Sequence, residues 1–145
     1  MSRLPVLKTP NKILKQKAKE VKNITAEIKQ QIFDMIETMK AENGAGLAAS
    51  QIGILNRVAI ATNNKNEIIP LINPVIIKKS FSKITIEEGC LSVPEKFIKI
   101  KRFKKIKIKA LGQNGKNLEF WATGMFAVVI QHEIDHLDGI LITDK

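Results

Sequence analysis

Residues 123–139 read TGMFAVVIQHEIDHLDG, and this stretch decides the fold that the sequence predicts. Apolar residues occupy nearly every face of it, which indicates a central, buried helix rather than a surface one. Gly139 is suited to closing that helix, because glycine readily adopts the left-handed conformation. The His, Glu and Asp side chains within a buried helix require polar partners, so we expect them to belong to a site.

Residues 132–136 of this helix form the pattern HExxH. Residues four apart on a helix project from the same face, so His132 and His136 can share one metal ion. Glu133 lies at the edge of that face, where it can take a proton from water without being a ligand. A helix whose histidines are only hydrogen-bonded is the alternative, but both His of the chain fall in this pentad. The spacing therefore favours a hydrolytic metal site, and its third ligand must come from elsewhere in the chain.

A candidate for the third ligand is the only cysteine, Cys90, in the segment EGCLS at residues 88–92. A lone cysteine excludes an internal disulfide and is more often a small buried hydrophobe. Added to two His, however, it completes a tetrahedral site with one position left for water, as in catalytic rather than structural sites. We expect Glu88 to support this site as a neighbour rather than a ligand, and Asp135 to be structural.

A third segment, GAGLAASQ at residues 44–51, contains small residues that allow another backbone to approach. It ends in Gln51, whose side-chain amide can donate a hydrogen bond. The end of a helix followed by a packed turn explains the glycines equally well.

The rest of the chain predicts one further helix and a set of strands. Residues 25–40 have helical spacing of apolar residues, with Thr25 as the N-cap, which predicts an amphipathic helix. Between residues 57 and 121 lie the β-rich runs VAIAT, IIPLI, PVIIK, ITIE and IKIKAL. The alternation in KIKIKAL, followed by a glycine turn and NLEFWA, predicts an antiparallel hairpin. The fold class is therefore α+β, with mostly antiparallel sheets packed around the central HExxH helix and with an N-terminal amphipathic helix.

Composition limits the class of protein. The 145 residues have no linker or internal repeat, so we expect a single domain over residues 1–145. With 44% hydrophobic and 26% charged residues, and with no leader or long apolar segment, a disordered, secreted or membrane-spanning chain is disfavoured. The net charge of +10 would attract polyanions. The lysines are spread along the chain, however, so nucleic acid is disfavoured as the direct substrate.

Taken together and in this order, GAGLAASQ, EGCLS and QHEIDHLDG resemble the three signature motifs of the peptide deformylases. The resemblance runs from the LKTPNKILKQKAKEV stretch near the start to HLDGIL near the end. It implies one divalent metal ion, natively Fe²⁺ and replaceable by Ni²⁺, Co²⁺ or Zn²⁺, with Cys90, His132 and His136 as ligands. It also implies Glu133 as general base and later proton donor, and an oxyanion site formed by the Gln51 amide and the N–H of Leu91.

The same resemblance implies that the N-formyl group is removed from the N-terminal formylmethionine of newly made polypeptides, releasing formate. An apolar pocket would take the methionine side chain, with a lining of Ala45, Ile86, Met125, Val128 and Val129. The substrate backbone would pair like an added strand with Ala45, Gly46 and Gly89, so we expect broad selectivity beyond methionine.

Two departures from the family bear on partners. Many bacterial relatives continue into a further C-terminal helix, whereas this chain stops at Lys145, and Phe97 stands where many relatives have Arg. We expect a monomer with transient ribosome contact, without a membrane or a specific nucleic-acid partner. The expected location is the cytoplasm of a bacterium or of a phage-infected host, or an organelle.

Two other functions remain open on sequence grounds. An HExxH peptidase would take its third ligand, a His or Glu, from downstream of the helix. Only nine residues follow His136, so this alternative is disfavoured. The second alternative is a catalytically silent protein of the deformylase fold that binds RNA or the ribosome through its basic surface.

Overall fold

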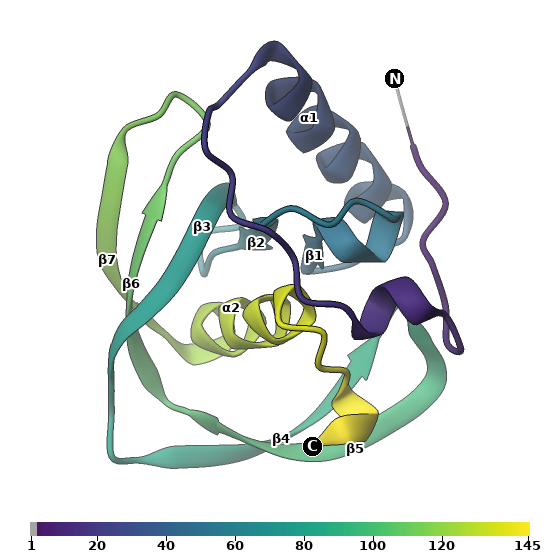
Figure 1. Ribbon diagram of the computed structural model, residues 1–145. Helices are drawn as coiled ribbons and strands as arrows, with labels where there is room; N and C mark the ends of the chain where they lie inside the picture. Colours follow the sequence, from purple (N-terminus) through teal and green to yellow (C-terminus); the bar gives the residue numbers. More distant parts are fainter. Residues whose placement is uncertain (1–2) are drawn as a thin grey trace.

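The computed structural model describes residues 3–145, which form two antiparallel sheets around a central helix (Figure 1). The helices are α1 (Ala26–Ala41) and α2 (Gly124–Leu137). A five-stranded sheet has the order β1 (Gly46–Ala48), β2 (Val58–Thr62), β3 (Ile68–Lys79), β6 (Lys105–Leu111) and β7 (Asn117–Thr123). A two-stranded sheet pairs β4 (Lys83–Cys90) with β5 (Val93–Phe103). Single 3-10 turns lie at Lys12–Lys15, Ala49–Ile52 and Ile142–Asp144. The predicted α+β class is confirmed.

Helix α2 lies between the two sheets, as Figure 1 shows, and nine of its 14 residues are buried. Its apolar side pairs Ala127 and Ile130 with Ile106 and Ile108 of β6 in the main core cluster. Gly139 closes the end of the helix at φ +78°, where a Cβ would lie 2.5 Å from the carbonyl oxygen of Lys15. The sequence prediction of a buried helix ended by Gly139 is therefore correct.

Helix α1 covers the other face of the large sheet at its β1 and β2 end. Thr25 caps it, because its hydroxyl accepts a hydrogen bond from the backbone N–H of Ile28. The buried side chains of Ile32 and Met35 pack in a second core cluster with Leu47 of β1 and Ile60 of β2. Strand β1 is thereby held between the two helices, which positions the GAGLAASQ segment over α2.

The strands differ from the prediction in two places. The runs IIPLI and PVIIK form one strand, β3, rather than two. Asn73 interrupts the register of this strand in a left-handed conformation, φ 54°, where its side-chain amide bonds both the N–H and the C=O of Val21. Strand β5 was not predicted, because charged residues alternate along most of its length. The predicted hairpin of β6 and β7 is present, with Leu111 opposite Asn117.

None of the helices in residues 3–145 is both long and apolar enough to cross a membrane.

Candidate metal centre

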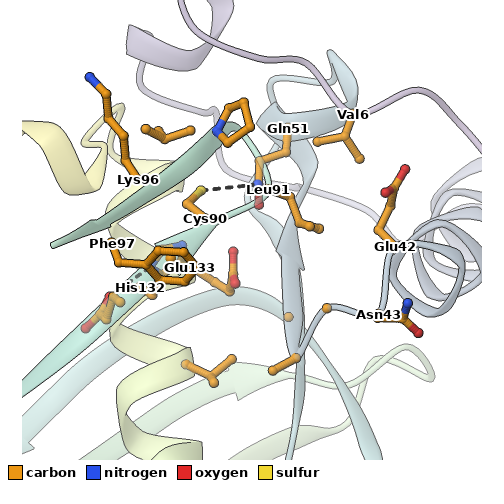
Figure 2. A pocket seen from close by; sticks show the side chains of 18 of the residues that line it. Val6, Glu42, Asn43, Gln51, Cys90, Leu91, Lys96, Phe97, His132 and Glu133 are labelled. Carbon is orange, nitrogen blue, oxygen red and sulfur yellow. Dashed lines mark hydrogen bonds and ion pairs between the residues drawn. The ribbon is translucent and has the colours of Figure 1, made fainter.

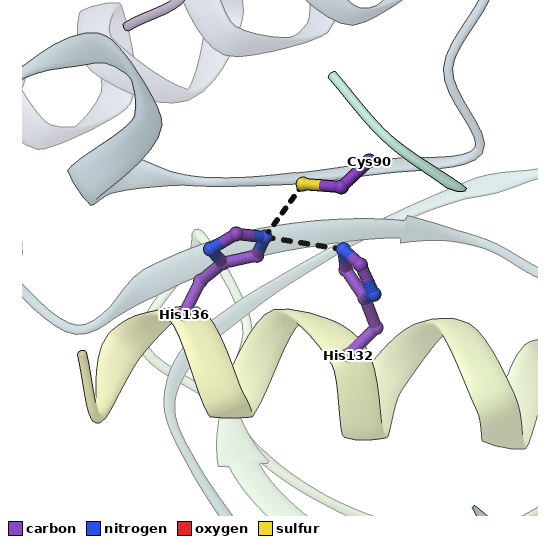
Figure 3. A group of neighbouring side chains, drawn as sticks. All are labelled: Cys90, His132 and His136. Atoms are coloured by element: carbon purple, nitrogen blue, oxygen red, sulfur yellow. Dashed lines mark hydrogen bonds between the residues drawn. The ribbon is translucent and has the colours of Figure 1, made fainter. Parts of the chain in front are cut away.

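Three potential metal ligands converge between β4 and α2 (Figure 3). Cys90 is the last residue of β4, and its Sγ lies 3.2 Å from Nε2 of His136. One helical turn separates His132 from His136 along α2, and their Nε2 atoms are 3.1 Å apart. All three ligand atoms lie within 4.8 Å of one another. The structure therefore brings together the three residues that the sequence proposes as ligands.

The surroundings of these residues fit a divalent ion. Nδ1 of His132 is 3.0 Å from a carboxylate oxygen of Glu88, which orients the ring so that its Nε2 lies toward Nε2 of His136. Burial alone would lower the pKa of His132, but its hydrogen bonds with Cys90 and Glu88 raise it to about 10, so a metal ion would have to displace a proton from this ring. Burial lowers the pKa of His136 to about 3, so its imidazole is neutral, as a ligand must be. One thiolate and two imidazoles are a donor set that binds iron, zinc and similar ions.

Behind His132 lies a buried network of charges that the sequence reading missed in part. Arg102 of β5 donates two hydrogen bonds to the carboxylate of Glu88, at 2.7 and 2.9 Å, and a third to Asp135. Burial alone would raise the pKa of Glu88, but the hydrogen bonds from Arg102 and His132 lower it to about 2. Glu88 is thus an ionised partner of His132, and Asp135 anchors Arg102 rather than the metal. The one feature of the sequence that indicates a buried Arg102 is its spacing of two from Ile100 and four from Ile98, which places all three on one face of a strand.

We expect that replacing Arg102 with leucine lowers the free energy of unfolding by about 3–5 kcal/mol, because the buried Glu88 would lose its guanidinium partner and Asp135 would keep only the partly exposed Lys145 as a cation. Urea denaturation of both proteins at matched metal content measures this difference. Lys15→Ala is the matched control, since the Lys15 and Asp144 side chains of that ion pair are 52% and 34% exposed and such pairs contribute about 0–1 kcal/mol. Equal stability losses in the two variants would contradict the role of Arg102.

Glu133 is placed beside the ligands but contacts none of them by a hydrogen bond. Its side chain is 4% exposed, and its Oε1 has no hydrogen-bond partner in residues 3–145. Burial raises the pKa of Glu133 to about 7. Gly46 of β1 allows this close approach, because a Cβ there would lie 2.7 Å from Oε2 of Glu133. A buried carboxyl group that titrates near neutrality is suited to carry protons.

Gln51 lies near Cys90, and hydrogen bonds of its side chain hold it in place. Its Oε1 accepts from the backbone N–H of Ala48 at 3.0 Å, and its Nε2 donates to the hydroxyl of Ser92 at 3.1 Å. The same Nε2 is 3.8 Å from Sγ of Cys90 (Figure 2). The amide nitrogen is therefore fixed toward the metal ligands, and Leu91 lines the same space.

A cavity of about 610 Å³ opens over this group (Figure 2). Six of the residues expected to bind substrate line it, namely Ala45, Gly46, Gly89, Met125, Val128 and Val129. Ile86 is not among the residues that line it, and its contact with substrate stays a prediction. Ile86 lies two residues before Glu88, on the same face of β4, and pairs in register with the buried Ile100. Phe97 also lines the cavity, with 69% of its surface exposed.

Comparison with known proteins shows that this chain is similar to enzymes of one kind. The sequence profile described as polypeptide deformylase matches residues 3–145. The peptide deformylase of Thermodesulfovibrio yellowstonii is 44% identical over 149 aligned residues, which cover 100% of this chain and 90% of that protein.

Solved structures agree with the fold over its full length. A class I type b peptide deformylase from Acinetobacter baumannii superposes with a TM-score of 0.97 at 35% identity, covering 100% of both chains. A second structure from that organism, with Met-Ala-Ser bound, gives a TM-score of 0.92 at 34% identity and covers 98% of this chain and 97% of the other. The matched residues include all the segments that carry the site described above.

Proposed function

Because the chain belongs to the polypeptide deformylase family, whose members remove the N-formyl group from new polypeptides, we propose that Cys90, His132 and His136 hold its metal ion and that Glu133 transfers its protons. The observation that carries this proposal is the convergence of three ligand atoms within 4.8 Å, beside a buried carboxyl group and under an open cavity. The family relation itself makes the chain a metal-dependent hydrolase. A catalytically silent protein of this fold is not favoured, since it would not need these groups in place.

The identity of the ion is part of the proposal. A thiolate and two imidazoles hold ferrous iron well, and nickel, cobalt or zinc would fit the same donors. A divalent ion held there acts as a Lewis acid toward the formyl carbonyl and makes water more acidic. We expect iron to be the native ion, with the others as substitutes.

Glu133 would carry the proton from water to the leaving group. As a carboxylate it takes a proton from the attacking water, whose oxygen then bonds to the formyl carbon. As a carboxylic acid it gives that proton to the amine nitrogen when the C–N bond breaks, and formate and a free N-terminus are released. Its unpartnered Oε1 and its pKa of about 7 support both roles.

Two neutral donors would stabilise the negative charge that develops on the formyl oxygen. Nε2 of Gln51 is positioned by Ala48 and Ser92 before substrate arrives, so little reorganisation is needed. The backbone N–H of Leu91 is the second donor in this proposal, because Leu91 follows the ligand Cys90 and lines the cavity.

The substrate would lie in the cavity in an extended form. Met125, Val128 and Val129 offer an apolar wall for the methionine side chain. Gly46 and Gly89 have no side chain of their own to obstruct a paired strand, and the ring of Phe97 lies against Gly89. The exposed ring of Phe97 would give the rim an apolar surface for the residues after methionine.

Residues 1–145 would act as one catalytic domain, with the N-formylmethionyl ends of nascent chains as substrates. We expect a monomer in the bacterial or phage-infected cytosol, or in an organelle, with transient ribosome contact.

Formate release from formyl-Met-Ala-Ser tests the proposed function, with protein purified without oxygen and the unformylated peptide as the control. We expect formate from the formylated peptide alone, at about one ion per chain by elemental analysis. Folded protein that holds its ion and releases no formate would overturn the proposal.

A further inference from the structure

A basic face lies on the large sheet, away from the cavity and on the side opposite α2. In β6 the even-numbered Ile106 and Ile108 enter the core with α2, so the odd-numbered lysines point to the other side. Trp121 of β7 lies opposite Lys107 in register, and Lys78 of β3 lies opposite Lys107 on its other side. We call Lys78, Lys105, Lys107, Lys109 and Trp121 the lysine face.

Opposing charge is scarce on the lysine face. Glu119 is the one acidic residue in β3, β6 and β7, and it forms an ion pair with Lys107 at 3.3 Å. Lys78 and Lys107 face each other across the strands, and like charges directly opposite in a sheet are destabilising. Glu119, which also lies opposite Lys109 in register, offsets one of these positive charges, and the charge that remains is available to a bound polyanion.

Exposed aromatic and apolar surface lies among these lysines. Trp121 is 45% exposed, and the ammonium groups of Lys105 and Lys107 lie 4.7 and 5.9 Å from its ring centroid. On β3, Val75 and Ile77 are 54% and 41% exposed. Proteins that hold single-stranded nucleic acid on a sheet combine an aromatic platform with a basic track in this way.

We propose that the lysine face binds the backbone of a single-stranded RNA segment, without preference for base sequence. Alternate lysines along β6 are about 7 Å apart, so they form a track that can contact successive phosphates, while Trp121 offers a surface for one base. The net charge of +10 favours a polyanion over a neutral partner. None of the five residues lines the catalytic cavity, so RNA binding and deformylation are separable.

Fluorescence anisotropy of a labelled poly-U RNA tests this inference on the intact metal-loaded protein. The double variant Lys105→Gln/Lys109→Gln should weaken binding about tenfold. It should also reduce the slope of log K against log salt concentration by about 1.4, because each lost phosphate contact reduces that slope by about 0.7. Trp121→Ala should weaken binding about tenfold at all salt concentrations, through lost stacking. Formate release from the tripeptide should be unchanged in both variants, which also shows that they are folded.

Lys29→Gln/Lys40→Gln is the matched control, because it removes the same charge from exposed positions on α1. Affinity lost equally in the control pair would mean that net charge alone attracts RNA, and would overturn the proposal. So would the absence of RNA binding by the unmodified protein. Vesicles of anionic lipid and a polyglutamate peptide are tested beside the RNA, and tighter binding of either would assign the face to that partner instead.

Discussion

Replacing Glu133 with alanine is expected to lower kcat for formate release by about 10²–10⁴-fold while the protein keeps about one ion per chain. The side chain contacts none of the three ligand atoms through a hydrogen bond, so its loss leaves the metal donors in place. Its removal takes away the one buried group beside the ligands whose pKa lies near neutrality. The measurement is formate release under saturating peptide, with elemental analysis on the same samples.

Glu133→Gln is the conservative companion, because it keeps the size of the side chain but cannot accept a proton. We expect it to lose activity as the alanine variant does. A glutamine variant with wild-type kcat would contradict proton transfer by Glu133. Loss of the ion from either variant would show instead that Glu133 holds the metal site together.

The parts of the site that the sequence could predict are those fixed by local geometry. Four-residue spacing on a helix places His132 and His136 on one face in any fold that keeps the helix, and the structure keeps it over Gly124–Leu137. The alternation of Lys and Ile similarly determines the hairpin of β6 and β7. Cys90 joined these residues only through the resemblance of its motif to a family and through its suitability as a ligand.

The parts that the sequence could not predict depend on which strands meet. Arg102 contacts Glu88 and Asp135 because β5 pairs with β4 and packs near α2, and no local pattern specifies that pairing. Ile86 enters the predicted substrate pocket only through resemblance to the family, and its register opposite Ile100 is likewise set by a pairing that no local pattern specifies. The double hydrogen bond between Asn73 and Val21 likewise joins residues that are 52 positions apart. Contacts between residues far apart in the sequence therefore determine which side chains support the metal ligands.

Replacing Cys90 with alanine is expected to abolish both metal binding and formate release. Two imidazoles on one helix would remain, which leaves the ion short of one donor and without the negative charge of the thiolate. Loss of a supporting neighbour of a ligand already costs about 10–100-fold in metal affinity, so loss of a ligand should exceed that. The measurement is metal content after dialysis, followed by formate release with the ion supplied in excess.

Ser92→Ala is the matched control for Cys90→Ala, because Ser92 lies two residues away, is fully buried and also contacts Gln51. We expect the Ser92 variant to keep its ion and to lose only the part of its activity that depends on the position of the Gln51 amide. If Cys90→Ala kept about one ion per chain after dialysis, Cys90 would be a packing residue and the metal would need a different third ligand. Within residues 3–145 no other Cys or His is near His132 and His136. Such a result would therefore leave Glu133 or Glu88 as the candidate third ligand. If Glu133 were that ligand, it could not be the general base proposed above.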